Sequence, residues 1–197
     1  MRREIRIAGF GGQGVVTMGA ILATAAGIHE NLEVAQTQSY GPEARGGACR
    51  SDVIISDEPI DYTKPLALDL FIGLSPTAVE QYWAEVQEGK TVVLVDKTLV
   101  AQTPPHSPDI LAIEATRIAE EEFKDRVVAN MVLLGALSAC TGWVGLKALE
   151  ETLPGRISEK TLTVSKAALR RGFEVGLRIC GDQRSAFELE KGKAEVR

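Results

Sequence analysis

The sequence predicts an α/β protein of three layers, in which helices cover both faces of a mostly parallel sheet. In its first half, short apolar or alternating segments typical of strands are separated by segments with apolar residues at helical spacing, and from Thr116 onward the patterns are helical. The chain has 197 residues, 45% of them hydrophobic and 25% charged, which is enough to bury one core without stapling by disulfides or metals.

Three strands and a helix are expected in the first part of the chain. Residues 4–10 alternate between polar and apolar side chains as a strand does, and they run into a glycine-rich turn. A helix is predicted over 15–29 and a second strand over 33–39. Residues 40–47 contain three glycines and a proline, so they predict a loop of special geometry. The alternation over 48–56 predicts a local antiparallel strand, which would make the sheet mixed.

The middle of the chain predicts the strands that complete the sheet. The apolar run Leu68–Leu74 suits a strand buried on both faces, and a helix should follow from Pro76 to about Gln87 with Ser75 as its N-cap. Further strands are expected over 91–95 and 110–113. The helices predicted after them span 116–123, 127–140, 145–153 and 158–180.

Charge and cysteine content narrow the function classes. The net charge of −5 and the pI of about 5.2 argue against a nucleic-acid-binding surface. No segment has the apolar length of a signal peptide or a membrane span, so neither export nor membrane insertion is expected. Cys49, Cys140 and Cys180 lack the spacing of metal ligands or of a disulfide framework, which favours free thiols in a reducing cytoplasm, with Cys140 and Cys180 in the helical core. We expect one domain over 1–181 and a charged tail over 182–197.

A glycine turn between the first strand and the first helix is the first candidate site. Gly9, Gly11 and Gly14 fit G-x-G-x-x-G in the strand-turn-helix context that makes this pattern Rossmann-like. Backbone N–H groups at the start of the helix could hold an anion there, assisted by the helix dipole. A dinucleotide site also needs an acidic residue near the end of the second strand, where this chain has Gln36, Gln38 and Ser39. A dinucleotide site, a site for another phosphate or carboxylate, and a turn used only for packing therefore all stay open.

The loop over 40–47 is the second candidate site, because its glycines imply a fixed backbone that presents polar groups. Arg45 could grip a phosphate or carboxylate through two hydrogen bonds, or it could brace the loop or a subunit contact. Tyr40 is as well suited to packing as to ligand contact.

Motifs for independent catalysis are absent from the sequence, which has no P-loop, nucleophile-elbow or zincin pattern. Its two histidines, His29 and His106, are expected on the surface. Cys49 is more readily explained as a core thiol than as a site residue, and Asn130 suits a structural hydrogen bond and a site equally. Glycine-rich loops without a convincing nucleophile, metal cluster or acid–base pair suggest a part of something larger.

Three segments together resemble the gamma subunit of 2-oxoacid:ferredoxin oxidoreductases. They are Gly9–Val15 (GFGGQGV), Gln38–Gly47 (QSYGPEARGG) and Ser56–Ile60 (SDEPI). The resemblance covers residues 1–181 as a single domain of the pyruvate/ketoisovalerate oxidoreductase gamma type and is nearest to the 2-oxoglutarate type. It implies a non-autonomous subunit of an enzyme that oxidatively decarboxylates a 2-oxoacid, 2-oxoglutarate in the nearest type, forms acyl-CoA and reduces ferredoxin.

The resemblance also implies where the cofactors lie. Thiamine diphosphate and iron–sulfur clusters would be on partner subunits, because this chain lacks cluster cysteine spacing and the thiamine fingerprint. The implied partners are alpha and beta subunits, with a ferredoxin-like delta subunit as an optional fourth, and the isolated chain would be inactive and could form a homodimer. No residue is expected to be catalytic or to bind metal. The positions implied to face CoA or a partner are Gly11, Gly12, Gln13, Gly14, Tyr40, Gly41, Glu43, Arg45, Gly46 and Gly47.

Two other function classes stay open from the sequence. An independent NAD(P)-binding enzyme of Rossmann type would use the glycine turn to bind its nucleotide. A non-catalytic regulatory module would bind a small molecule without associating with thiamine or iron–sulfur subunits.

Overall fold

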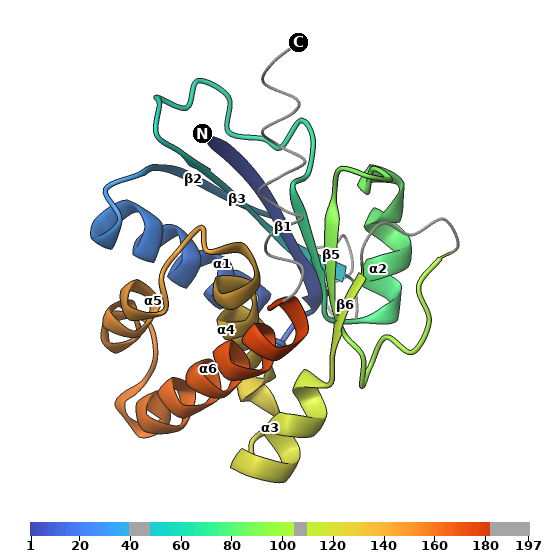
Figure 1. Ribbon diagram of the computed structural model, residues 1–197, viewed down its shortest axis with the longest axis vertical. Helices are drawn as coiled ribbons and strands as arrows, with labels where there is room; N and C mark the ends of the chain where they lie inside the picture. Colours follow the sequence, from blue (N-terminus) through green and yellow to red (C-terminus); the bar gives the residue numbers. More distant parts are fainter. Residues whose placement is uncertain (40–47, 105–109, 182–197) are drawn as a thin grey trace.

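The computed structural model describes residues 1–39, 48–104 and 110–181. Its strands are β1 (Arg2–Phe10), β2 (Glu33–Ser39), β3 (Ala48–Ser56), β4 (Leu70–Gly73), β5 (Val92–Asp96) and β6 (Ile110–Ile113). They form one six-stranded sheet in the order β2-β3-β1-β4-β5-β6 (Figure 1). β3 runs antiparallel to both of its neighbours, whereas β1, β4, β5 and β6 are parallel. The prediction of a mostly parallel sheet made mixed by one local excursion is confirmed.

Six α-helices occur in the described part of the chain. They are α1 (Val15–Thr24), α2 (Pro76–Tyr82), α3 (Ala115–Phe123), α4 (Ala129–Thr141), α5 (Leu146–Thr152) and α6 (Glu159–Cys180). The expected cap of α2 is confirmed, since the Ser75 hydroxyl accepts a hydrogen bond from Ala78 N–H at 3.3 Å. α2 is shorter than predicted, because Trp83–Glu85 tighten into a 3₁₀ turn. None of these helices is long and apolar enough to cross a membrane.

The helices cover the two faces of the sheet unequally. On one face, α1 and α3 to α6 bury the larger core, to which β1 contributes Ile5 and Ile7. On the other face, α2 packs over a smaller core that contains Phe71 and Val95. Figure 1 shows α2 on the opposite side of the sheet from α1, α4 and α6. The three layers are therefore present, and one of the helical layers is thin.

Two helices of the thicker layer, α4 and α6, run parallel with their backbones in contact. A Cβ placed on Gly172 of α6 would lie 1.9 Å from the carbonyl oxygen of Val132 in α4. A Cβ on Gly135 of α4 would lie 2.0 Å from the carbonyl oxygen of Leu169 in α6. Glycine is required on both sides, because any side chain would force the two helices apart.

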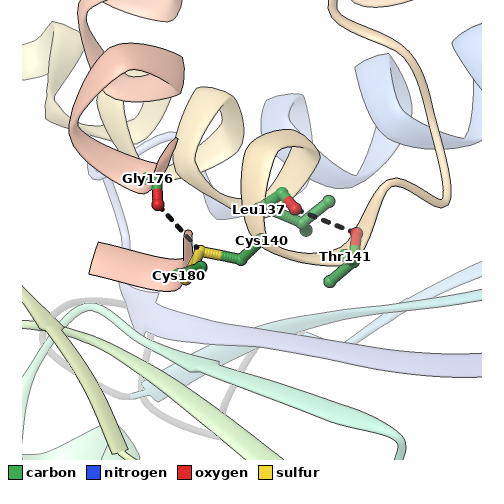
Figure 2. Close-up of a disulfide and its surroundings, with 5 residues drawn as sticks. All are labelled: Leu137, Cys140, Thr141, Gly176 and Cys180. Atoms are coloured by element: carbon green, nitrogen blue, oxygen red, sulfur yellow. Dashed lines mark hydrogen bonds between the residues drawn. A yellow bond between two sulfur atoms is a disulfide. The ribbon is translucent and has the colours of Figure 1, made fainter. Parts of the chain in front are cut away.

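The prediction that the chain has no disulfide is wrong, because Cys140 and Cys180 are bonded to each other (Figure 2). Both are buried on helices as expected, with 3% and 2% of their surface exposed. They are 40 residues apart in sequence, so they match no compact spacing pattern. The parallel packing of α4 on α6 brings their Cα atoms to 5.3 Å, a separation suited to a disulfide.

Candidate functional site

The glycine turn lies at the carboxyl end of β1 and leads directly into α1. Gln13 N–H donates to the carbonyl oxygen of Phe10 at 3.2 Å and closes the turn. Gly12 and Gly14 have φ angles of 92° and 75°, in the left-handed region that favours glycine. Gly11 and Gly12 are exposed, with open space where a side chain would be. The backbone of the turn is therefore accessible to a ligand.

Gln13 braces this turn from within. Phe10 N–H donates to Gln13 Oε1 at 2.6 Å, and Gln13 Nε2 donates to the carbonyl oxygen of Leu74 at 2.9 Å. Because Leu74 follows β4, the amide ties the ends of two neighbouring strands together. Both ends of its side chain are engaged within the protein, so Gln13 positions the turn, and contact of its side chain with a ligand stays a prediction.

The turn stands where the strand order reverses. From β1 the chain passes through α1 to β2 on one side, while β4 pairs with β1 on the other side. Open α/β sheets bind their ligands at the carboxyl ends of the strands at such a point. The fold therefore places the glycine turn where a ligand site is expected.

A cavity of about 450 Å³, which we call the glycine-turn cavity, opens beside the turn. Three helices start at its wall: α1 at Gly14–Thr17, α4 at Val128–Met131, and α6 near Ser158 and Thr161. The start of α1 leaves backbone N–H groups without helical partners and carries the positive end of the helix dipole. Before α4, the 3₁₀ turn Arg126–Val128 already uses such groups, and Val127 N–H donates to Asp125 Oδ1 at 3.0 Å. α1 and α4 have no acidic residue in their first turns, and Arg156 adds a cation at the cavity. This wall favours an anionic ligand, although Asp125 also borders it.

Asn130 is a buried polar side chain of this cavity. It lies in the first turn of α4, is only 5% exposed, and forms no hydrogen bond through its amide with any described residue. A Cβ on Gly14 would lie 2.1 Å from Asn130 Nδ2, so the amide lies directly against the turn. It also borders a second cavity of about 250 Å³ beside Asp96. Because the amide borders open cavities and has no partner among the described residues, it is free to hydrogen-bond to water or to a ligand there.

Ser165 faces the same cavity from α6. It is 3% exposed, and within the described residues its hydroxyl has no hydrogen-bond partner. Sequence reasoning missed Ser165, Ser158 and Arg156, because no local motif marks them. A serine on the buried face of an amphipathic helix was the available signal, and the packing of α6 on α4 brings it to the turn.

Cys49 lines the cavity from the start of β3 and is 6% exposed. Burial raises the pKa of its thiol, so the thiol stays protonated at neutral pH. A protonated thiol is a poor nucleophile, which argues against covalent catalysis by Cys49. His29 lies away from the cavity, with Nδ1 3.3 Å from a carboxylate oxygen of Glu151. The described residues contain no group of three His, Cys, Asp or Glu side chains that could hold a metal.

The strand order disfavours a dinucleotide at the turn. Dinucleotide sites use an acidic residue at the end of a second strand that neighbours the first. Here β3 lies between β1 and β2, so the end of β2 is two strand spacings, roughly 10 Å, from β1. Gln36 of β2 instead donates from Nε2 to the Ser51 hydroxyl of β3 at 3.1 Å.

Six of the predicted site residues lie outside the described residues. They are Tyr40, Gly41, Glu43, Arg45, Gly46 and Gly47. The described chain resumes at Ala48, whose Cα pairs with that of Phe10, the residue that opens the glycine turn. β3 therefore begins beside the turn, and the role of residues 40–47 stays a prediction.

Comparisons with known proteins identify related chains. The model of the pyruvate ferredoxin/flavodoxin oxidoreductase family matches residues 4–175. The 2-oxoglutarate synthase subunit KorC of Methanocaldococcus jannaschii is 45% identical over 177 residues, which are 89% of this chain and 94% of that protein. The solved gamma subunit of keto/oxoacid ferredoxin oxidoreductase from Geobacter sulfurreducens is 38% identical, with a TM-score of 0.81, and the match covers 91% of this chain and 98% of that one.

A longer chain also contains this fold. The solved 2-oxoglutarate:ferredoxin oxidoreductase from Magnetococcus marinus, with 2-oxoglutarate, coenzyme A and succinyl-CoA bound, is 26% identical with a TM-score of 0.79. The match covers 89% of this chain and 31% of that one. The same fold thus occurs both as a separate polypeptide and as part of a larger one.

Proposed function

Because this chain belongs to the pyruvate ferredoxin/flavodoxin oxidoreductase family and is a gamma-type subunit of a 2-oxoacid:ferredoxin oxidoreductase, we propose that its complex acts on 2-oxoglutarate. The complex would convert 2-oxoglutarate and CoA to succinyl-CoA and carbon dioxide and pass two electrons to ferredoxin. The 45% sequence identity to a subunit of a 2-oxoglutarate synthase supports this substrate over other 2-oxoacids. Family membership and the strand order favour this function over an independent NAD(P)-binding enzyme or a regulatory module.

The contribution that we propose for this chain is to bind and orient CoA through the glycine-turn cavity. CoA carries a diphosphate and a ribose phosphate, and its thiol accepts the acyl group. The start of α1 suits a phosphate, and Asn130, Ser165 and Arg156 can add hydrogen bonds. The cavity volume of about 450 Å³ lies within the rough range of 300–1,000 Å³ for small-molecule sites.

Partner subunits would supply the remaining chemistry. We propose that alpha and beta subunits, with an optional ferredoxin-like delta subunit, carry thiamine diphosphate and the iron–sulfur clusters. The segment 40–47 would contact CoA or one of these partners. Ferredoxin is a carrier of the reducing cell interior, so the cytoplasm is the compartment in which we expect the complex to work.

The unpaired Asn130 amide is the observation that carries the CoA assignment. In the assembled enzyme, Asn130→Ala should lower kcat/KM for CoA by about 10- to 150-fold, which corresponds to about 1.5–3 kcal/mol for a hydrogen bond to a charged group. The KM for 2-oxoglutarate at saturating CoA should be unchanged. Steady-state kinetics with each substrate varied in turn measures both constants.

Ser138→Ala is the matched control for this experiment. Ser138 lies on the same helix, is 2% exposed, and donates to the carbonyl oxygen of Val144 at 2.7 Å, away from the cavity. Its replacement should leave the CoA kinetics unchanged even if it destabilises the fold. Unaltered CoA kinetics in Asn130→Ala would refute the CoA assignment, and weakened subunit assembly in the same variant would make this surface an interface.

A further inference from the structure

Cys140 and Cys180 lie at the carboxyl ends of two helices that pack on each other. Cys140 lies in the last turn of α4 and Cys180 is the last residue of α6 (Figure 2). The disulfide between them lies in the helical layer, away from the glycine turn at the other end of α4. Cys140 Sγ is also 3.7 Å from the carbonyl oxygen of Gly176, an acceptor that only a reduced thiol can use.

The disulfide is the main tie between the last turn of α6 and the rest of the protein. Leu177 and Ile179 are 41% and 37% exposed, and Arg178 between them is also exposed. Cys180 is the buried residue of this turn. Without the cross-link, Cys180 and the partly exposed Leu177 and Ile179 would be the apolar contacts of this turn, and helix ends with few fully buried contacts open more readily than helix interiors.

We propose that Cys140 and Cys180 form a reversible thiol-oxidation site that locks α4 to α6. The two helices are parallel, and their opposite ends carry Asn130 and Ser165 at the glycine-turn cavity. Between the two ends, the glycine contacts at Gly135 and Gly172 pack the backbones directly on each other. The cross-link therefore restrains the same helix pair that forms one wall of the cavity.

The redox chemistry is a two-electron exchange with a peroxide as the oxidant. A thiolate attacks hydrogen peroxide to give a sulfenic acid and hydroxide, which takes up the proton released by that thiol, and the second thiol then displaces water from the sulfenic acid to form the disulfide. A dithiol reverses the step by thiol–disulfide exchange and is itself oxidised to a disulfide. Opening of the last turn of α6 gives these reagents access to the buried sulfurs.

The redox state of Cys140 and Cys180 during turnover is inferred from the proposed function, on which no other step of this proposal rests. Ferredoxins carry electrons at potentials below those at which most protein disulfides are reduced. The pair is therefore expected as two thiols while the enzyme turns over. Exposure to peroxide would then form the disulfide between α4 and α6 and stabilise the subunit under conditions in which turnover stops.

The test compares the two redox states of the full-length chain, purified without oxygen and then treated with hydrogen peroxide or with dithiothreitol. Thiol alkylation followed by mass spectrometry should find Cys140 and Cys180 blocked after peroxide and free after dithiothreitol. Closure of a 40-residue loop should raise Tm by several degrees, up to about 15 °C, in the oxidised form. Amide hydrogen exchange over 177–180 should be faster in the reduced form.

Two variants make the result specific to this pair. Cys49→Ala should keep both responses, and the double variant Cys140→Ser, Cys180→Ser should lose both. If the double variant does not fold, the comparison of the two wild-type states stands by itself. Free thiols at both positions after peroxide, or equal Tm and exchange in the two states, would overturn the proposal. These readouts need neither CoA nor partner subunits, so their failure is independent of the proposed function.

Discussion

At the scale of single residues, the site depends on how closely Asn130 approaches Gly14. The glycines of the turn could be recognised in the sequence because a positive φ or a close approach restricts which residue a position accepts. The partners of polar side chains could not, because they depend on packing. Gln13 is engaged by Phe10 and Leu74, whereas Asn130 has no partner among the described residues, and nothing in the sequence around either residue distinguishes them.

Gly14→Ala should destabilise the protein by about 1–3 kcal/mol, and Gly11→Ala should change little. Gly14 has a φ of 75°, and a Cβ there would lie 2.1 Å from Asn130 Nδ2, whereas a Cβ on Gly11 meets nothing within 4 Å. Urea denaturation of both variants measures the difference. Adding Asn130→Ala to Gly14→Ala should recover the steric part of the loss, and an equal loss at Gly11 would contradict this account.

At the scale of elements, periodicity predicted every strand and helix of the described chain, and the errors lie in their ends and pairing. β3 illustrates the limit: the alternation over 48–56 predicted a strand, but its insertion between β1 and β2 is a tertiary contact. That insertion removes β2 from the glycine turn and with it the geometry of a dinucleotide site. The disulfide between α4 and α6 was missed for the same reason, since its cysteines are 40 residues apart.

An ion pair between α5 and α6 gives the helical layer a pH dependence. Arg170 Nη2 donates to Glu150 Oε2 at 3.1 Å, and this hydrogen bonding to Arg170 lowers the pKa of Glu150. Because the pKa is lowered in the folded state, the stabilisation is present above the ordinary pKa of the carboxyl group and is lost as pH falls through the folded pKa. The Arg170 side chain is 62% exposed, so screening limits the contribution to at most about 1 kcal/mol.

Glu150→Gln should therefore lower the free energy of unfolding at pH 7 by up to about 1 kcal/mol and make almost no difference at pH 3. Urea unfolding of the wild type and the variant at the two pH values measures this. Glu88→Gln is the control, because Glu88 is exposed and forms no ion pair with any described residue. A loss of equal size at both pH values would rule out the ion pair as its cause.

At the scale of the whole molecule, the chain has the surface of a subunit. Large apolar side chains are exposed at several places, among them Val127 at 60% beside the glycine-turn cavity and Leu66 at 74% on the loop before β4. Among the described residues that border the cavity, no nucleophile is activated by a neighbouring base. Exposed apolar side chains next to such a cavity are typical of a surface that another chain covers, as expected for a subunit.

Isolation of this chain from its native host without oxygen should therefore recover alpha and beta subunits together with iron and thiamine diphosphate, identified by mass spectrometry and cofactor analysis. The chain alone should show no CoA-dependent turnover of 2-oxoglutarate with ferredoxin, and addition of the partners should restore it, because thiamine chemistry and electron transfer need groups that this chain is not expected to hold. As a control for adventitious copurification, the recombinant chain is added to a preparation of the partner subunits that was made without it. Recovery of a lone chain that binds a nicotinamide nucleotide would contradict the subunit function, since the end of β2 would then have to reach a ribose from two strands away.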